Sequence, residues 1–356
     1  MKTLNAQLSQ MLNQQQQHFA EQIVARQYAL QPELWQSYGA KGRELCVRDV
    51  MYHFQYLSEA ILAADPTLFA DYVGWVKQLF AGLNFPDEVM LTTLECTRDI
   101  LNESEEFSEE MMAIIDKHIQ AGLEQMQQAP PASPSFIEAE APLTGLLEQY
   151  IAALLQGERH VASQLILNAV DQGISIKAIY LEVFQRAQYE IGRLWMTNQI
   201  SVAQEHYCTA ATQLIISQLY PHIFATEKIG RRLVATCVGG ELHEIGVRMV
   251  TDFFEMEGWD TYYLGANTPT TTILQTIETR TPDVLGVSAT MTFHLSLVEE
   301  LIGLARDMPA GQQLKILVGG YPFKKRPGLW QKLGADGFAQ DAQEAIDIAN
   351  TLLATE

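Results

Sequence analysis

The sequence predicts a multidomain protein with an all-helical N-terminal domain, a second helical bundle and a C-terminal α/β domain built on a parallel sheet. Three observations predict this order. Apolar residues recur at helical spacing in the N-terminal part, as in 51–62 and 69–80. Residues 127–142 are rich in Pro, Ala and Ser, which is typical of a linker. Beyond residue 230, short apolar runs alternate with helical segments, a pattern that gives parallel strands with right-handed crossovers.

We expect four segments along the 356 residues: a helical domain over 1–128, a linker over 129–142, a four-helix bundle over 143–228 and the α/β domain over 229–356. Ser201 followed by Gln204 forms a capping-box pattern, which predicts the start of the last bundle helix. Short polar joints between helices favour an antiparallel arrangement. The four predicted helices are Leu143–Leu155, Val161–Gln172, Ile176–Trp195 and Val202–Phe224.

The C-terminal segment predicts a Rossmann-like, flavodoxin-like sheet, because strands and helices alternate along it. The predicted strands are 233–238, 260–264, 284–288, 315–318 and 337–339, and the predicted helices are 245–257, 270–279, 295–307, 327–333 and 342–353.

Composition and charge exclude several classes of protein. The formal net charge of −20 is spread over both halves, so neither half has the basic face that duplex DNA requires. No run of 18 apolar residues occurs and the N-terminus has no apolar signal region, so we expect no membrane span and a cytoplasmic location. The four cysteines form no CxxC pair, which disfavours a disulfide framework or a thiolate zinc site.

The turn from the first predicted strand into its helix carries a candidate ligand. Ligands of doubly wound sheets collect at this carboxyl edge of the sheet. His243 can project away from the sheet, Glu241 can accept its second ring N–H, and Gly246 lacks the Cβ that would block a large planar group. A lone HxxG is usually only a turn. A dinucleotide site is disfavoured because Gly239-Gly240 does not fit G-x-G-x-x-G.

These residues resemble a known family. The order Glu241-x-His243-x-x-Gly246, then Ser288, then Gly319-Gly320 is similar to the DxHxxG…SxL…GG pattern of cobalamin-binding domains. The resemblance implies that the nucleotide tail of cobalamin enters a slot in the sheet and that His243 becomes the lower axial cobalt ligand. Glu in place of Asp and the missing Leu are departures shared with the light-sensing branch. The expected corrinoid contacts here are Glu241, Leu242, His243, Ile245, Gly246, Ser288, Thr290, Gly319 and Gly320.

The helical bundle resembles the cap of CarH-type cobalamin photoreceptors. Trp195 ends one predicted helix, and Glu205-His206 lies in the first turn of the next. The resemblance implies that Trp195 packs on the adenosyl group of adenosylcobalamin, that Glu205 contacts its ribose, and that His206 becomes the upper cobalt ligand after photolysis. Taken singly, Trp195 is compatible with ordinary core packing, and Glu205-His206 with a solvated first turn.

The N-terminal domain departs from CarH, which has a DNA-binding domain there, and the whole chain resembles photocobilins, which join a cobalamin module to a helical biliverdin-binding domain. The second resemblance implies biliverdin between residues 52 and 75, in a pocket that faces the bundle. We expect non-covalent binding, because neither Cys46 nor Cys96 lies in a context that indicates thioether attachment. His53, Asp71, Tyr72 and Trp75 are the expected bilin contacts. An aromatic-rich dimerisation or sensor-coupling bundle explains the same residues.

We therefore expect a light sensor rather than an enzyme, with adenosylcobalamin and possible biliverdin as chromophores. Photolysis of the Co–C bond would drive a conformational or oligomeric switch. The expected partners are further copies of the chain in a homo-oligomer or a protein output partner. We expect no direct DNA binding. The alternative is a corrinoid carrier that shuttles a methyl group between partner methyltransferases. A further alternative is a light-independent cobalamin-sensing adaptor.

Overall fold

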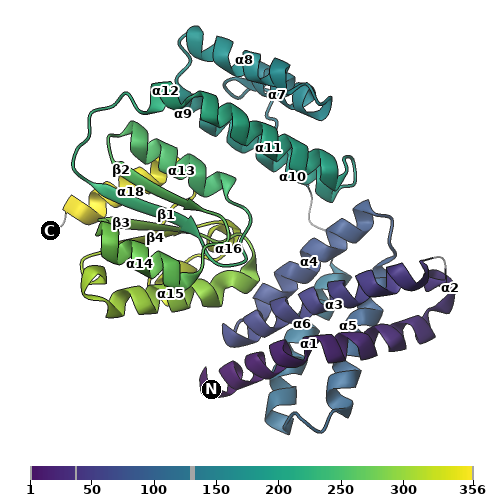
Figure 1. The fold of residues 1–356 in the computed structure, drawn as a ribbon. Helices are drawn as coiled ribbons and strands as arrows, with labels where there is room; N and C mark the ends of the chain where they lie inside the picture. The colour runs from purple at the N-terminus through teal and green to yellow at the C-terminus, as the bar shows by residue number, and fades with distance from the viewer. Residues whose placement is uncertain (1, 37, 129–132, 355–356) are drawn as a thin grey trace. The chain divides into compact units, whose positions relative to one another are not determined.

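The computed structural model describes residues 2–36, 38–128 and 133–354, which are drawn as ribbons in Figure 1. The chain divides into two compact units, Met1–Ser133 with Met196–Asn198, and Pro134–Trp195 with Gln199–Glu356. None of the helices in the described ranges combines the length and apolar character that crossing a lipid bilayer requires.

The first unit is all-helical, as predicted. Its core is apolar and aromatic, and the Phe19 ring packs on both Phe54 and Phe107. Asp65 caps the fourth helix by accepting a hydrogen bond from the Thr67 backbone N–H at 3.0 Å. The helices are α1 (Lys2–Leu30), α2 (Pro32–Trp35), α3 (Gly39–Leu62), α4 (Pro66–Gly82), α5 (Asp87–Glu103) and α6 (Glu109–Gln127).

The second unit begins with the predicted helical bundle. The predicted capping box is confirmed, because Ser201 and Gln204 bond each other's backbone N–H. Two details differ from prediction: the third helix contains a π-helical stretch, and the last helix ends early, at Gln218. The bundle consists of α7 (Thr144–Leu155), α8 (Arg159–Asp171), α9 (Ile176–Ile179), the π-helix η1 (Tyr180–Gln185), α10 (Arg186–Met196), α11 (Val202–Gln218) and α12 (Tyr220–Ile223).

The rest of the second unit is the predicted parallel α/β domain. Its five strands lie in the order β2-β1-β3-β4-β5, and every neighbouring pair is parallel, so β3 is the middle strand with β1 and β4 on either side. The strands are β1 (Arg232–Cys237), β2 (Asp260–Gly265), β3 (Val284–Ser288), β4 (Lys315–Gly319) and β5 (Gly337–Phe338). The helices are α13 (Ile245–Met256), α14 (Thr270–Arg280), α15 (Leu295–Asp307), α16 (Tyr321–Lys325), α17 (Leu329–Lys332) and α18 (Ala342–Ala354), with short 3-10 turns at Thr292–His294 and Pro309–Gly311.

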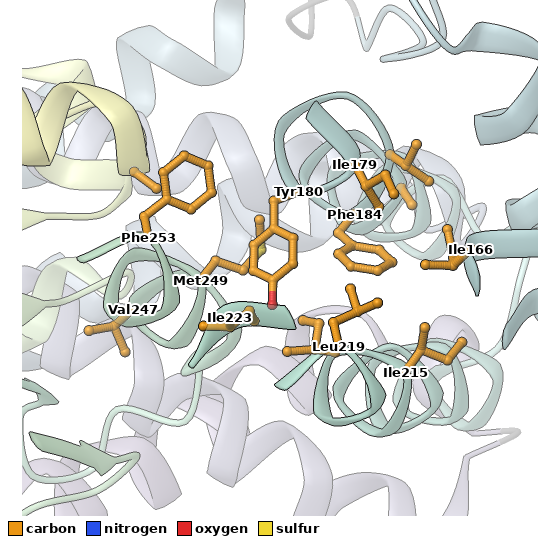
Figure 2. Packing of buried hydrophobic residues seen from close by; sticks show 14 of the residues in the cluster. Ile166, Ile179, Tyr180, Phe184, Ile215, Leu219, Ile223, Val247, Met249 and Phe253 are labelled. Carbon is orange, nitrogen blue, oxygen red and sulfur yellow. The ribbon is translucent and has the colours of Figure 1, made fainter. Parts of the chain in front are cut away.

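One apolar core joins the bundle to the α/β domain. Figure 2 shows Tyr180 and Phe184 of the bundle beside Met249 and Phe253 of α13, with Leu219 below them. These side chains are all buried, so separating the bundle from the sheet would expose a continuous apolar surface, at about 25 cal/mol per Å² of apolar area. The bundle and the α/β domain therefore fold as one body.

A buried polar contact crosses the same core. The Tyr180 hydroxyl donates to Asp252 Oδ2 at 2.9 Å, and Asp252 is only 6% exposed. Burial raises the pKa of Asp252 from its usual 3.8 to about 6, although the hydrogen bond from Tyr180 opposes the shift. The folded chain therefore takes up a proton at Asp252 more readily than the unfolded chain. The resulting stabilisation is complete below about pH 4 and is lost as the pH rises through 6.

We expect the Asp252→Asn substitution to remove this pH dependence. Between pH 7 and pH 4, the unfolding free energy of the wild type should rise relative to that of Asp252→Asn by about 2–3 kcal/mol. Urea unfolding at several pH values measures the difference. Asp307→Asn, on the exposed end of α15, is the matched control and should run parallel to the wild type. A constant gap between wild type and Asp252→Asn at all pH values would contradict the assignment.

Candidate functional site

A buried carboxylate organises the loop that follows β1. Glu241 is 0% exposed, and each of its oxygens accepts several hydrogen bonds. Oε1 accepts from the backbone N–H of His243 at 3.0 Å and from its Nδ1 at 2.6 Å. Oε2 accepts from the backbone N–H groups of Thr290 at 2.7 Å and Met291 at 3.0 Å, and from His294 Nδ1 at 3.1 Å. The loop after β1 is therefore bound to the segment after β3.

These hydrogen bonds decide the charge of Glu241. Burial alone would raise the pKa of Glu241, but the hydrogen bonds from His243 and His294 and from the backbone outweigh it and hold the pKa far below its usual value. Glu241 is therefore an anion at neutral pH and can only accept hydrogen bonds. It follows that both histidines must carry a proton on Nδ1.

His243 consequently has a defined orientation. Its Nδ1–H donates to Glu241, which leaves Nε2 as the nitrogen available to a ligand, and 57% of the side chain is exposed. The hydrogen bond to Glu241 raises the pKa of His243, burial opposes this, and the charges of Glu241 and Glu205 add to the increase. The predicted contact between Glu241 and His243 is thus present, and it involves Nδ1 and not Nε2 of the ring.

The surface around His243 is open and apolar enough for a flat ligand. Leu242 is 71% exposed, so its apolar side chain is accessible beside His243. A Cβ built on Gly246 would meet no atom within 4 Å. Ile245, half-buried at the start of α13, completes this surface. An exposed imidazole with adjoining apolar side chains and an open glycine is a set of groups compatible with a large planar group that carries a metal.

The carboxyl ends of β3 and β4 lie at the same edge of the sheet as the loop after β1. Ser288 pairs in register with Gly319 across β3 and β4, and the Ala289 N–H donates to the Gly319 carbonyl at 3.1 Å. Thr290 follows at once and donates to Glu241. Gly320 has φ +114°, and a Cβ there would lie 2.0 Å from the Ala289 carbonyl oxygen. Glycine at this position is therefore required by the close approach of two backbone segments.

Three residues predicted to lie over the upper face of the cofactor are on the bundle: Trp195, Glu205 and His206. Trp195 is half-buried near the end of α10. The His206 ring bonds the Glu205 carboxylate through Nδ1 at 2.5 Å, and its side chain is 75% exposed. The Thr209 hydroxyl lies 3.0 Å from Glu205 Oε1 and 2.9 Å from Oε1 of Gln188 on α10, and its single hydrogen can be donated to either oxygen. The structure thus gives each histidine its own carboxylate partner.

Three polar residues of the site escaped sequence analysis. His294, 5% exposed, is the second histidine on Glu241. Glu244 and Gln213 form a hydrogen bond of 3.1 Å between the His243 loop and α11. None of the three stands at a motif position, and each has its partner far away in the sequence. Only the folded chain brings them together.

The expected bilin residues lie within the first unit. His53 Nδ1 and the Tyr72 hydroxyl are 2.7 Å apart, and the Tyr72 ring stacks on Tyr56 and lies 6.2 Å from Trp75. Burial lowers the pKa of His53 to about 4, so the ring is neutral. Asp71 is exposed. A small apolar hollow beside His53, lined by Phe54, Leu57, Phe69, Thr93, Leu94 and Thr97, has room for about one water molecule, much less than a tetrapyrrole needs.

Comparison with known families agrees with the geometry of the second unit. Residues 231–347 and residues 146–220 match two family models, each described as a B12 binding domain. Residues 2–123 match the family model of phycobilisome proteins.

Known relatives are corrinoid proteins. A corrinoid protein of Desulfitobacterium hafniense is 24% identical over 217 residues, which are 59% of this chain and 99% of that protein. Dimethylamine corrinoid protein 3 of Methanosarcina mazei is 28% identical over 168 residues, 47% of this chain and 96% of that protein. The solved structure of the Methanosarcina barkeri monomethylamine corrinoid protein aligns with a TM-score of 0.52 at 19% identity, over 60% of this chain and 100% of that one.

The second unit is therefore a cobalamin-binding module, with a helical bundle and a parallel α/β domain. The predicted fold class is confirmed by the observed sheet and by the likeness to the monomethylamine corrinoid protein. The comparisons support the alternative function, that of a corrinoid protein, better than a CarH-type photoreceptor. The adenosyl form of the cofactor and the bilin stay predictions.

We expect Gly320→Ala to destabilise the second unit through backbone strain and a steric clash, because the substitution changes no titratable group. The left-handed φ and the contact with the Ala289 carbonyl should together cost about 3 kcal/mol of unfolding free energy. Gly303→Ala is the matched control, because it lies in α15 with no atom within 4 Å of the new Cβ. It should stabilise the chain by about 0.5–1 kcal/mol. Urea unfolding measures both changes. If Gly320→Ala were as stable as the wild type, the close contact between Gly320 and the Ala289 carbonyl would be contradicted.

Proposed function

We propose that the second unit holds a corrinoid with His243 as the lower cobalt ligand and the nucleotide base displaced. The observation that carries this proposal is the Glu241–His243 pair, because a fully buried anion fixes the ring with Nε2 outward. Leu242, Ile245 and Gly246 would lie under the corrin ring, and Ser288, Thr290, Gly319 and Gly320 beside the displaced tail.

The corrinoid would supply a cobalt centre that carries an axial carbon group. The chain's residues do the rest. Glu241 keeps the proton on His243 Nδ1 and makes the imidazole a stronger ligand. The apolar side chains exclude water from the lower face. Residues 143–228 would cover the upper face of the corrinoid. Residues 1–128 would form a separate domain, which the linker over 129–142 connects to the bundle.

His243→Ala should weaken cobalamin binding by about tenfold or more, since even the loss of a residue that only orients a ligand typically costs 10–100-fold. The bound fraction should show the absorption spectrum of a form without a histidine ligand. Binding titrations with hydroxocobalamin, followed by absorption, measure both effects. His222→Ala, an exposed histidine of α12, is the control. Unchanged affinity and spectrum in His243→Ala would refute the assignment.

For the complete chain, the relatives favour the function of a corrinoid carrier, which passes a methyl group between partner methyltransferases. The support is that corrinoid proteins align with this chain over 96–99% of their own length. Such a carrier is not itself an enzyme, and its partners are proteins that reach the upper face of the corrinoid.

The second candidate is a cytoplasmic light sensor that uses adenosylcobalamin, and one observation favours it. The match to phycobilisome proteins covers residues 2–123, which lie outside the matched B12 binding domains. In this function Trp195 and Glu205 would select the adenosyl group, and His206 would become the upper cobalt ligand after photolysis. Biliverdin would then bind near His53, Asp71, Tyr72 and Trp75, which requires the aromatic side chains around the present hollow to move apart.

One preparation distinguishes these functions. We expect a carrier to retain methylcobalamin and adenosylcobalamin equally. A light sensor should retain adenosylcobalamin preferentially, lose the preference in Trp195→Ala, and change its elution volume on size exclusion after green light. Co-expression with a biliverdin-producing haem oxygenase should add a red absorption band only if the first unit binds the bilin. Adenosyl preference without any response to light would instead indicate a light-independent cobalamin-sensing adaptor.

A further inference from the structure

A polar seam joins helix α11 and the adjoining α12 to helix α13. Gln213 donates to Glu244 Oε1 at 3.1 Å. One turn further along both helices, Arg248 donates to the Ser217 hydroxyl at 2.7 Å and to the Tyr220 hydroxyl at 3.1 Å, with its guanidinium 5.5 Å from the Tyr220 ring centre. Residues four apart lie on the same face of a helix, so the seam runs along both helices in register.

Glu244 has an unusual role in this seam. It is the N-cap residue of α13, but its side chain makes no hydrogen bond to that helix. Short polar side chains such as Asp and Ser ordinarily cap their own helix at this position. Here Oε2 accepts from the Tyr263 hydroxyl at 2.9 Å and from the Ala266 N–H at 3.0 Å, while Oε1 accepts from Gln213. One side chain next to His243 therefore binds the end of β2 and helix α11 at the same time.

The seam sets the distance between the two faces of the site. Helix α13 begins two residues after His243, and helix α11 carries Glu205 and His206 in its first turns. Gln213 is eight residues beyond Glu205, about 12 Å along the helix axis. Because α11 is a rigid rod, the height of Glu205 above His243 depends on where α11 is attached to α13. Glu244, the residue after His243 in the chain, forms one such attachment through its hydrogen bond with Gln213.

We propose that Glu244 is a positioning residue that holds α11 over His243 and thereby controls how long a corrinoid stays between them. This inference rests on the proposed binding of a corrinoid at His243. It adds that the bundle opens at the Gln213 end of the seam, while the buried core around Tyr180 and Leu219 keeps the bundle attached.

The seam can be broken and restored by exchanging the two groups. In Gln213→Glu, two carboxylates that can only accept hydrogen bonds face each other, so the contact is lost and becomes repulsive. In the double variant Gln213→Glu, Glu244→Gln, the amide introduced at position 244 can donate an N–H to the carboxylate introduced at position 213. The oxygen of that amide can still accept from Tyr263 and Ala266. Gln218→Glu is the matched control on the same helix, because its oxygen accepts from the Ser163 hydroxyl and a carboxylate does this equally well.

Two measurements on the full chain test the proposal. The first is the rate at which bound hydroxocobalamin is released, which should rise about tenfold in Gln213→Glu, the effect of losing one hydrogen bond to a charged group. The second is hydrogen–deuterium exchange of residues 202–213 in the cobalamin-free protein, which should become faster. Both should return to the wild-type value in the double variant and stay unchanged in Gln218→Glu.

Wild-type release and exchange in Gln213→Glu, or a double variant that behaves like Gln213→Glu, would overturn the proposal. A general loss of folding cannot imitate the expected result, because the double variant would not be rescued. If the wild type bound no cobalamin, the proposed function would fail, and the exchange measurement would still decide whether Glu244 holds α11.

Discussion

The buried carboxylate of Glu241 is the interaction on which the rest of the site depends. An isolated carboxylate at 0% exposure is strongly unfavourable, and this one is stable because five donors surround it. The donors come from the loop after β1 and from the segment after β3. Because an anion accepts hydrogen bonds and donates none, the arrangement also determines which nitrogen of His243 stays free. The Glu241 side chain thus sets the geometry of the loop, places a buried negative charge there and orients the His243 ring.

The site has two sides because the bundle and the α/β domain share one core. Tyr180 and Phe184 of the bundle pack against α13, the helix that begins at the His243 loop. Glu205 and His206 start α11, which is bonded to α13 through Glu244 and Arg248. In the proposed site, each face of the corrinoid would therefore meet a histidine paired with a carboxylate, and the packing of α11 on α13 would set the distance between these two pairs.

The two candidate functions use this module in opposite ways. A carrier needs the upper face to open towards partner proteins, and a light sensor needs a close fit around the upper group. The corrinoid relatives give information about the second unit only, because their alignments cover 47–59% of this chain. The first unit matches phycobilisome proteins, so a function of the whole chain must also account for this unit.

Local patterns were enough to predict much of this protein. Helical periodicity, the Ser201–Gln204 box and the strand–helix alternation are properties of neighbouring residues, so the fold class and the Glu241–His243 contact followed from the sequence. The short helix α16 escaped because its five residues, with Pro322 among them, are too few to show periodicity. His294, Glu244 and Gln213 escaped because each bonds a partner in another element. The aromatic residues near His53 pack on one another, which a list of aromatic residues does not reveal. The sequence by itself determined the fold class, the place of most of the longer helices and strands, and which histidine lies at the sheet edge. Only the tertiary structure decided how the buried charges are balanced, because hydrogen bonds between distant segments depend on packing in three dimensions.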